Sequence, residues 1–156
     1  MSSEKWKIIL CPLGSWGDVH PFVWLGKLLV RRGYDVTALV AEPFEPAMQH
    51  VGVKTVRMMS AEDFEAFTRH PDLWHPRKAF EVVANSVLQV CLSTIDAIRE
   101  NVVPEKTLII SGAIAFGARI FAEAEHIPHI TIQLQPTSFI SAKKPSLMAA
   151  GLECVE

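Results

Sequence analysis

The chain has 156 residues, of which 49% are hydrophobic and 21% charged, and its formal net charge is −2. This composition is typical of one globular domain and leaves little room for disorder. The weak negative charge and the lack of a Lys/Arg cluster argue against nucleic acid as a partner. The 3 cysteines are scattered along the sequence, so they indicate neither a disulfide framework nor a metal site.

The amino-terminal residues lack the apolar region of a signal peptide, and no apolar run reaches the length that crosses a bilayer. These two observations favour a cytoplasmic protein.

Short apolar runs alternate with segments of helical spacing along the whole chain. The runs predict buried parallel strands at residues 6–10, 36–40, 53–56, 107–110 and 129–132. The helical spacing predicts helices at residues 22–32, 47–51, 61–69, 77–101 and 114–125. This alternation predicts a single α/β domain over residues 1–156, with a doubly wound, mainly parallel Rossmann-like sheet.

The longest predicted helix, at residues 77–101, is expected to bury one continuous apolar stripe. Its members recur at intervals of three and four residues. They are Phe80, Val83, Val87, Leu88, Cys91, Ile95 and Ile98.

Residues 10–21 connect the first strand to the first helix, and we expect them to form a turn at the carboxyl end of that strand. Open α/β sheets bind their ligands at this end. Gly14 and Gly17 would let the backbone approach a ligand closely. Their spacing matches neither a dinucleotide fingerprint nor a P-loop. A plain tight turn explains the glycines equally well.

Asp18 and His20 are the titratable residues of this turn. Asp18 either accepts hydrogen bonds from the free N–H groups of the following helix or acts as a general base. His20, next to Pro21, is open to three roles: a base, an orienting partner or a turn residue.

Hydroxyl and aromatic residues elsewhere add candidates. Ser111, Thr137 and Ser138 follow strands and would face the same crevice as Asp18, unless they bond only to the local backbone. The predicted loop at residues 72–76 carries the large aromatic Trp74, and such loops often line a site. No metal site is expected, because the histidines of this region have no acidic or cysteine partner at ligand spacing. A Gly-x-Ser-x-Gly elbow is missing, so a hydrolase nucleophile has no support.

Three blocks of the sequence resemble the N-terminal half of GT-B glycosyltransferases, of the family 28 and family 1 type that includes sterol, antibiotic and rhamnosyl transferases. The first block reads GSWGDVHP at residues 14–21 and continues through residues 25–37. The others comprise residues 42–44 with 52–53, and residues 111–118, 127–128 and 133–136. The resemblance spans nearly the whole chain.

The resemblance implies that this chain binds an acceptor, and that the nucleotide-sugar donor binds a C-terminal domain absent from it. Asp18 falls where related inverting transferases carry a catalytic Asp or His. It would deprotonate an acceptor hydroxyl, which then attacks the anomeric carbon without a metal; His20 is the second catalytic candidate. The expected substrate-binding residues are Gly14, Ser15, Gly17, Phe64, Trp74, Phe80, Ser111, Gln135, Thr137 and Ser138.

The same resemblance implies the partners. The nucleotide-sugar is a co-substrate, no other cofactor is expected, and the donor domain would be supplied in cis or in trans. The aromatic and aliphatic candidate wall favours a lipidic or polyketide-like acceptor. A lipidic acceptor would bring peripheral contact with a membrane. Without the donor domain, the chain alone is expected to be inactive.

Two other function classes fit parts of the sequence. A non-catalytic small-molecule-binding module, or one half of a split glycosyltransferase, would use Asp18 only as a helix cap. A nicotinamide-dependent oxidoreductase ranks last because the glycine fingerprint is missing, although Glu42 lies near the place of its acidic residue.

Overall fold

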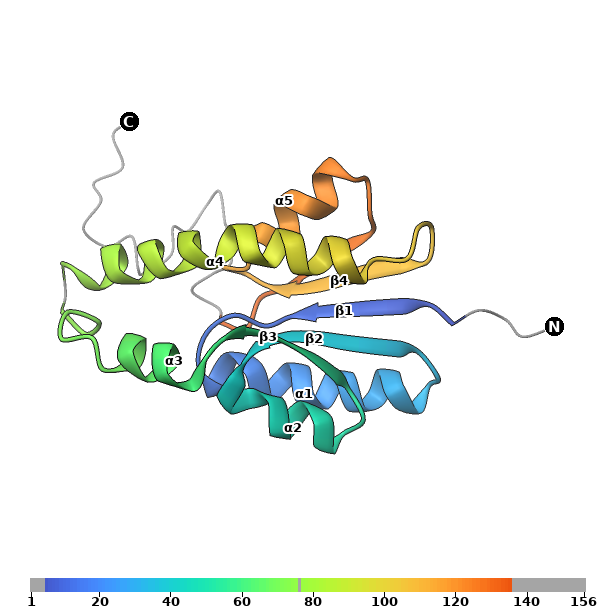
Figure 1. Ribbon diagram of the computed structural model, residues 1–156, viewed down its shortest axis with the longest axis horizontal. Helices are drawn as coiled ribbons and strands as arrows, with labels where there is room; N and C mark the ends of the chain where they lie inside the picture. The colour runs from blue at the N-terminus through green and yellow to red at the C-terminus, as the bar shows by residue number, and fades with distance from the viewer. Residues whose placement is uncertain (1–4, 76, 136–156) are drawn as a thin grey trace.

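A central parallel sheet with helices on both faces forms the computed structural model, which describes residues 5–75 and 77–135 (Figure 1). The strands are β1 (Lys7–Cys11), β2 (Asp35–Ala41), β3 (Lys54–Met59), β4 (Thr107–Gly112) and β5 (His129–Ile132). The helices are α1 (Trp16–Arg31), the 3₁₀ helix η1 (Glu42–Phe44), α2 (Glu45–His50), α3 (Ala61–Thr68), α4 (Ala79–Asn101) and α5 (Phe116–Ala124). The predicted doubly wound α/β fold is confirmed.

The strand order is β3-β2-β1-β4-β5, and all neighbouring strands are parallel. The chain builds the sheet outward from β1 to β3 and then returns to place β4 on the other side of β1. The point of reversal therefore lies between β1 and β4, where doubly wound sheets open a crevice at their carboxyl ends. Figure 1 shows α1 and α2 on one face of the sheet and α4 and α5 on the other.

The core has one apolar cluster on each face of the sheet. Successive side chains of a strand point to opposite faces. Ile8 and Leu10 therefore join the cluster that includes Phe22, whereas Ile9 joins the cluster that includes Ile98. Continuous apolar strands are expected where helices cover both faces.

The first helix corrects the sequence prediction, because it begins at Trp16 and not at residue 22. Ser15 is its N-cap residue, and Asp18 occupies the third helical position. Pro21 lies inside the helix, where it has no N–H to donate to the carbonyl of Gly17. Asp18 and His20 thus belong to a helix and not to a turn, while the other elements lie close to their predicted bounds.

The apolar stripe predicted for α4 is also corrected. Val87, Val90 and Ile98 are buried, but Phe80 and Leu88 are 84% and 64% exposed. The amino-terminal half of α4 extends beyond the ends of the strands, so it has less sheet to pack against (Figure 1). Within residues 5–75 and 77–135, α4 alone is long and apolar enough to cross a membrane, contrary to the expectation from the sequence. Only 17% of its most apolar 18-residue window is buried inside the structure, although Ile98 is fully buried.

Candidate functional site

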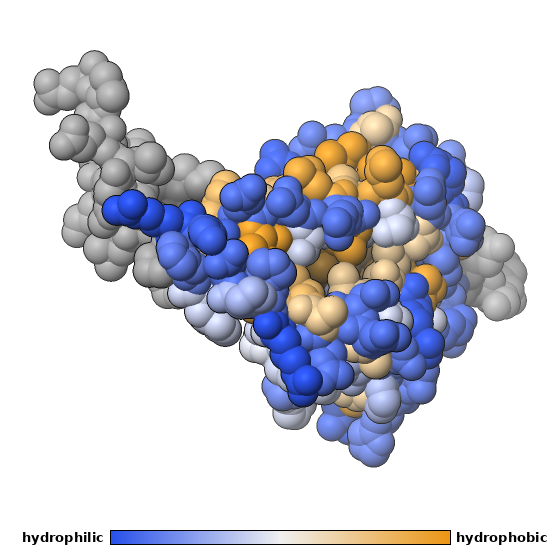
Figure 2. Space-filling model, turned by 60° about the vertical axis from the view of Figure 1, so that its left-hand side comes forward, coloured by the Kyte–Doolittle hydropathy of each residue, from blue (hydrophilic) through white to orange (hydrophobic). Residues whose placement is uncertain are grey.

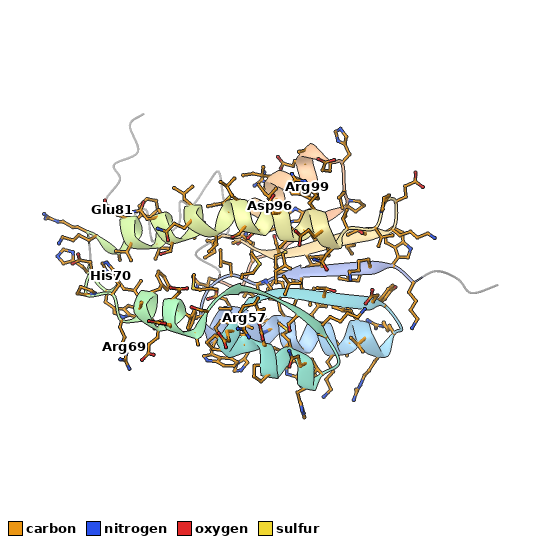
Figure 3. All side chains as sticks on the ribbon, in the orientation of Figure 1. Arg57, Arg69, His70, Glu81, Asp96 and Arg99 are labelled. Atoms are coloured by element: carbon orange, nitrogen blue, oxygen red, sulfur yellow. The ribbon has the colours of Figure 1, made fainter. Side chains whose placement is uncertain are left out.

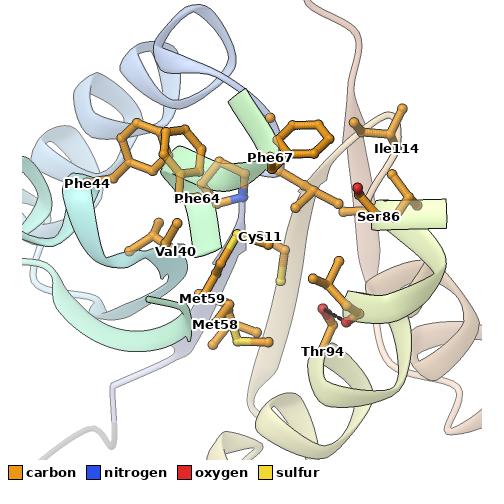
Figure 4. Close-up of a pocket in the computed structure, with 18 of the residues that line it drawn as sticks. Cys11, Val40, Phe44, Met58, Met59, Phe64, Phe67, Ser86, Thr94 and Ile114 are labelled. Atoms are coloured by element: carbon orange, nitrogen blue, oxygen red, sulfur yellow. Dashed lines mark hydrogen bonds between the residues drawn. The ribbon is translucent and has the colours of Figure 1, made fainter. Parts of the chain in front are cut away.

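Three adjoining hollows lie at the carboxyl ends of the strands. The central one, here called the inner cavity, has a volume of about 80 Å³. Its walls are apolar and come from the strand ends, from α3 and from α4; they include Val40, Phe44, Met59, Phe67 and Val87 (Figure 4). In Figure 2, the view turned toward this end, apolar side chains gather in a hollow bordered by polar ones. An apolar concavity of this kind is typical of small-molecule sites.

The second hollow, the Asp18 pocket, has a volume of about 190 Å³ and lies beside the inner cavity. Asp18 and Gln135 both line it, as does the apolar ring of Phe22. Leu13 and Ile114 line the Asp18 pocket as well as the inner cavity. The inner cavity and the Asp18 pocket are therefore adjacent.

The third hollow, the outer cleft, lies between α3 and α4 and has a volume of about 790 Å³. It shares Met58, Met59 and Phe67 with the inner cavity. The three hollows thus form a row from the Asp18 pocket through the inner cavity to the outer cleft.

The two carboxylate oxygens of Asp18 have different surroundings. Oδ2 accepts hydrogen bonds from the backbone N–H of Ser15, at 2.8 Å, and from the Ser15 hydroxyl, at 3.1 Å. The first of these bonds belongs to a capping box at the start of α1. Oδ1 accepts no hydrogen bond from the described residues, and the side chain is half-buried at the Asp18 pocket. One oxygen holds the loop and the other is free to accept a proton.

Gly14 makes room for this carboxylate. Its φ of +134° lies in the region that favours glycine, and a Cβ at this position would collide with the Asp18 carboxylate. The close approach predicted for the glycine turn therefore involves the side chain of the same chain. Gly17, in contrast, lies exposed in the first turn of α1.

His20 lies on α1 with Asp18, but the structure does not bring it to the Asp18 pocket. Residues two positions apart on a helix point in widely different directions. The His20 imidazole is exposed and packs on Trp16, with 4.9 Å between ring centroids. Trp16 in turn meets Phe44 edge-on at 4.7 Å, so His20 sits at the outer end of a row of rings.

Two aromatic residues expected in the binding wall lie elsewhere. Trp74 and Phe80 are 87% and 84% exposed and line none of the three hollows. Phe64, the remaining aromatic candidate, lines the inner cavity and contacts Phe44 edge-on at 5.1 Å. Aromatic side chains thus reach the site from α1, α3 and η1, and not from the loop after α3.

Ser111 lies inside β4 and not after it, which corrects its predicted position. Its hydroxyl is buried and shares a hydrogen bond of 2.8 Å with Nε2 of His129 on β5. This pair ties neighbouring strands together away from the three hollows. Thr137 and Ser138 lie outside the described residues, so the candidate hydroxyls that follow β5 are not placed.

Burial shifts the pKa of two side chains near the sheet. Burial lowers the pKa of His129, and the positive charge of Arg119 adds to this effect while Glu123 opposes it. Burial strongly raises the pKa of the Cys11 thiol, which therefore stays protonated and is a poor nucleophile. Within the described ranges no group of three or more His, Cys, Asp or Glu could hold a metal ion.

An ion-pair network that sequence reasoning missed holds α3 beside the inner cavity. The Arg57 guanidinium donates to Glu45 at 2.9 Å and lies 3.2 Å from Glu42 (Figure 3). The Arg57 hydrogen bond holds the pKa of the Glu45 carboxyl below its usual value. Glu42 also accepts the backbone N–H of Ala61, the first residue of α3, at 3.0 Å. The helix that carries Phe64 is thereby fixed to the edge of the sheet.

Sequence reasoning also missed Leu13, Met58, Met59 and Ile114, which line or divide the hollows. All of them lie at or just after the carboxyl end of a strand. That position was the available signal, since the ends of parallel strands meet at one edge of the sheet.

Comparison with known sequences gives a short match. No protein-family model matches the chain. A segment of 51 residues is 33% identical to the sterol 3-beta-glucosyltransferase of Pichia angusta, and it covers 33% of this chain and 4% of that protein.

Comparison with solved structures gives a match over most of the chain. The glycosyltransferase of kitacinnamycin has a TM-score of 0.67 and 22% identity, over 85% of this chain and 31% of its own. The calicheamicin glycosyltransferase CalG4 has a TM-score of 0.67 and 17% identity, over 88% of this chain and 34% of its own. A spinosyn rhamnosyltransferase complexed with spinosyn aglycone has a TM-score of 0.60 and 15% identity, over 85% of this chain and 36% of its own. The chain has the fold of GT-B glycosyltransferases, as the sequence resemblance implied, and spans about a third of the length of these structures.

Proposed function

We propose that this chain is the acceptor-binding domain of an inverting, metal-independent glycosyltransferase of the family 28 type. The enzyme would move a hexose from a nucleotide-sugar to a hydroxyl of a lipidic or polyketide-like acceptor. One observation carries the proposal: Asp18 presents a free carboxylate oxygen beside an apolar cavity, in a fold shared with glycosyltransferases.

The proposed mechanism uses the two oxygens of Asp18 for different tasks. The apolar body of the acceptor lies in the inner cavity and directs a hydroxyl past Leu13 and Ile114. Oδ1 of Asp18 takes the hydroxyl proton as the acceptor oxygen attacks the anomeric carbon from the face opposite the nucleotide. The new glycosidic bond forms, the bond to the nucleoside diphosphate breaks, and the configuration inverts. Oδ2 keeps its bonds to Ser15 and so holds the base in place.

The donor would be bound mainly by a second half of the enzyme, in cis or in trans. A spinosyn rhamnosyltransferase of this fold was solved with thymidine diphosphate, and this chain covers 36% of it. The nucleotide-sugar is then a co-substrate, and this chain by itself would be inactive. We place the reaction in the cytoplasm, with contact to a membrane surface if the acceptor is a lipid.

The first test measures sugar transfer by this chain, joined to or mixed with the donor-binding half, in wild type and Asp18→Asn. A general base typically contributes 10²–10⁴-fold, so turnover should fall by about that factor while acceptor binding is retained. Asp96→Asn is the matched control, because it removes one carboxylate charge on an exposed face of α4 away from the hollows (Figure 3). Unchanged turnover in Asp18→Asn would overturn the proposed base.

The alternative is a non-catalytic binding module or one half of a split transferase. The capping bonds of Asp18 Oδ2 favour it, because they give the carboxylate a structural role without any chemistry. In that case Asp18→Asn would weaken α1 without affecting any transfer. Denaturant unfolding of the two variants, read beside the transfer assay, separates the two readings.

A further inference from the structure

Helix α4 carries two neighbouring stripes of different chemistry. Val83, Val87 and Val90 line the inner cavity. Asn85, Gln89 and Ser93 recur at intervals of four residues and line the outer cleft. Since residues four apart lie on one face of a helix, the second stripe, which begins with the Glu81 carboxylate, presents a continuous row of polar groups, and its other three members are uncharged. The change from apolar to polar lining therefore coincides with the passage from the inner cavity to the outer cleft.

The polar groups of the outer cleft differ in whether they already have partners. Lys78 Nζ lies 3.3 Å from the carboxylate of Asp72, and the Asp63 carboxylate accepts the Ser60 hydroxyl at 2.7 Å. The amides of Asn85 and Gln89 are exposed and make no hydrogen bond within the described structure. An amide both donates and accepts, so these side chains suit a ligand that offers hydroxyl groups.

The two volumes indicate how a ligand would be divided between the hollows. The inner cavity, at about 80 Å³, accepts a narrow apolar group, because a single water needs roughly 10–15 Å³ on the same scale. The outer cleft, at about 790 Å³, has room for a bulkier group. Met59 and Phe67 line both hollows, so one ligand can occupy them together.

We propose that the outer cleft is a second binding site, for a neutral, hydroxyl-rich group at the end of the acceptor that lies away from Asp18. A sugar already attached to the acceptor has this chemistry. The inference rests on the proposed function, because it assumes that the apolar body of the same acceptor occupies the inner cavity. It follows that an earlier glycosyl transfer or hydroxylation must modify the far end of the acceptor before the step that Asp18 assists.

The test compares two soluble probes that differ only in a sugar: 1-octanol and n-octyl β-D-glucoside, the latter kept below its micelle-forming concentration. Binding to the ¹⁵N-labelled chain is followed by NMR, which also resolves the side-chain amide signals of Asn85 and Gln89. Both probes should shift signals from the inner cavity, and only the glucoside should shift these two amide signals. Two new neutral hydrogen bonds should make the glucoside bind roughly 10-fold more tightly.

The double variant Asn85→Ala/Gln89→Ala should bring the two affinities together and leave octanol binding unchanged. Both side chains are exposed, so the variant should keep its fold, which unchanged cavity signals verify. Gln133→Ala is the matched control: it removes an exposed amide that lines none of the three hollows, and it should keep the 10-fold preference within error.

Equal affinity of the two probes for the wild type, or an undiminished preference in the double variant, would overturn the second site. Octanol would still shift the inner-cavity signals in that case, and the acceptor site of the proposed function would survive. Absence of binding by both probes would overturn the inference and count against the proposed acceptor site as well.

Discussion

Gly14 and Asp18 depend on each other through the space they share. The backbone of any other residue at position 14 would have to adopt a φ of +134°, and its side chain would also collide with the Asp18 carboxylate. Asp18 and the loop that faces it therefore cannot vary independently.

We expect Gly14→Ala to lower the free energy of unfolding by about 1–3 kcal/mol, because it adds a collision to the backbone strain. Gly33→Ala is the control, since Gly33 also has a positive φ, of +88°, but nothing within 4 Å of an added Cβ. It should cost roughly 1 kcal/mol from strain alone. Urea unfolding of both variants measures the difference between their losses in the free energy of unfolding. Equal losses would mean that the loop shifts to accommodate the added Cβ and that the contact with Asp18 is unimportant.

At the residue level, the structure places the predicted residues Asp18 and Gln135 on one pocket and leaves Trp74 and Phe80 outside the three hollows; the roles predicted for them stay predictions. Asp18 was found by its position after the first strand, a rule that follows from sheet topology. The sequence could not show that Asp18 faces the pocket and His20 does not, because this difference appears only once both residues are known to lie on a helix. Trp74 and Phe80 were chosen because they are large and aromatic, and residue type alone does not determine which way a side chain points.

Among the elements, α3 is the one whose position depends on a small number of polar contacts. It buries no residue completely, yet it carries Phe64 and Phe67 to the inner cavity. Glu42 and Arg57 fix its amino-terminal end.

We expect Arg57→Met to free α3 without unfolding the domain. Exposed ion pairs contribute little to the free energy of unfolding, and Arg57 is 52% exposed, so global stability should change little. Hydrogen exchange at the first turn of α3 should become faster, and octanol binding should weaken. Arg69→Met is the control, because it breaks an exposed pair with Glu65 within α3 itself. A similar increase in exchange for both variants would contradict an anchoring role.

The element boundaries that the sequence misjudged have identifiable causes. Glycine and proline between residues 14 and 21 lower the helical propensity, but the Ser15–Asp18 capping box starts α1 there nonetheless. For α4, apolar periodicity predicted burial along its whole length. The helix extends beyond the sheet, and within the described residues Phe80 and Leu88 remain 84% and 64% exposed.

For the whole molecule, the partly buried imidazole of His129 on β5 makes stability depend on pH. Burial lowers the pKa of His129 below its ordinary value of 6.5, so the folded state prefers the neutral imidazole. The stability that this preference contributes is fully present above pH 6.5, the pKa of the histidine in the unfolded chain. It is lost as the pH falls toward the lower pKa of His129 in the folded state.

We therefore expect wild type to lose more stability than His129→Gln between about pH 7.5 and about pH 5. The glutamine amide can still bond to Ser111 but does not titrate. Urea unfolding at the two pH values measures both losses, and the other histidines contribute equally to the two proteins. Identical losses would show that His129 does not carry this dependence.

The overall architecture was the most predictable level. Alternation of five apolar runs with amphipathic segments leaves a parallel, doubly wound sheet as the natural arrangement, and the strand order agrees with it. The hollows were not predictable, because they depend on side chains from α3 and α4 that meet only in three dimensions. Hydrophobic periodicity reports burial and does not distinguish a packed core from a cavity wall.

The two stripes of α4 also bear on how readily such a domain can change its ligand. Asn85, Gln89 and Ser93 are exposed, so substitutions there leave the core intact. Val87 and Val90 are buried, and changes at those positions affect folding together with recognition. A mutational library confined to the outer stripe would therefore sample new polar specificities at little cost in folded protein. Helix α4 thus carries both the exposed stripe, where substitutions can change ligand specificity, and the buried valines, where substitutions also affect folding.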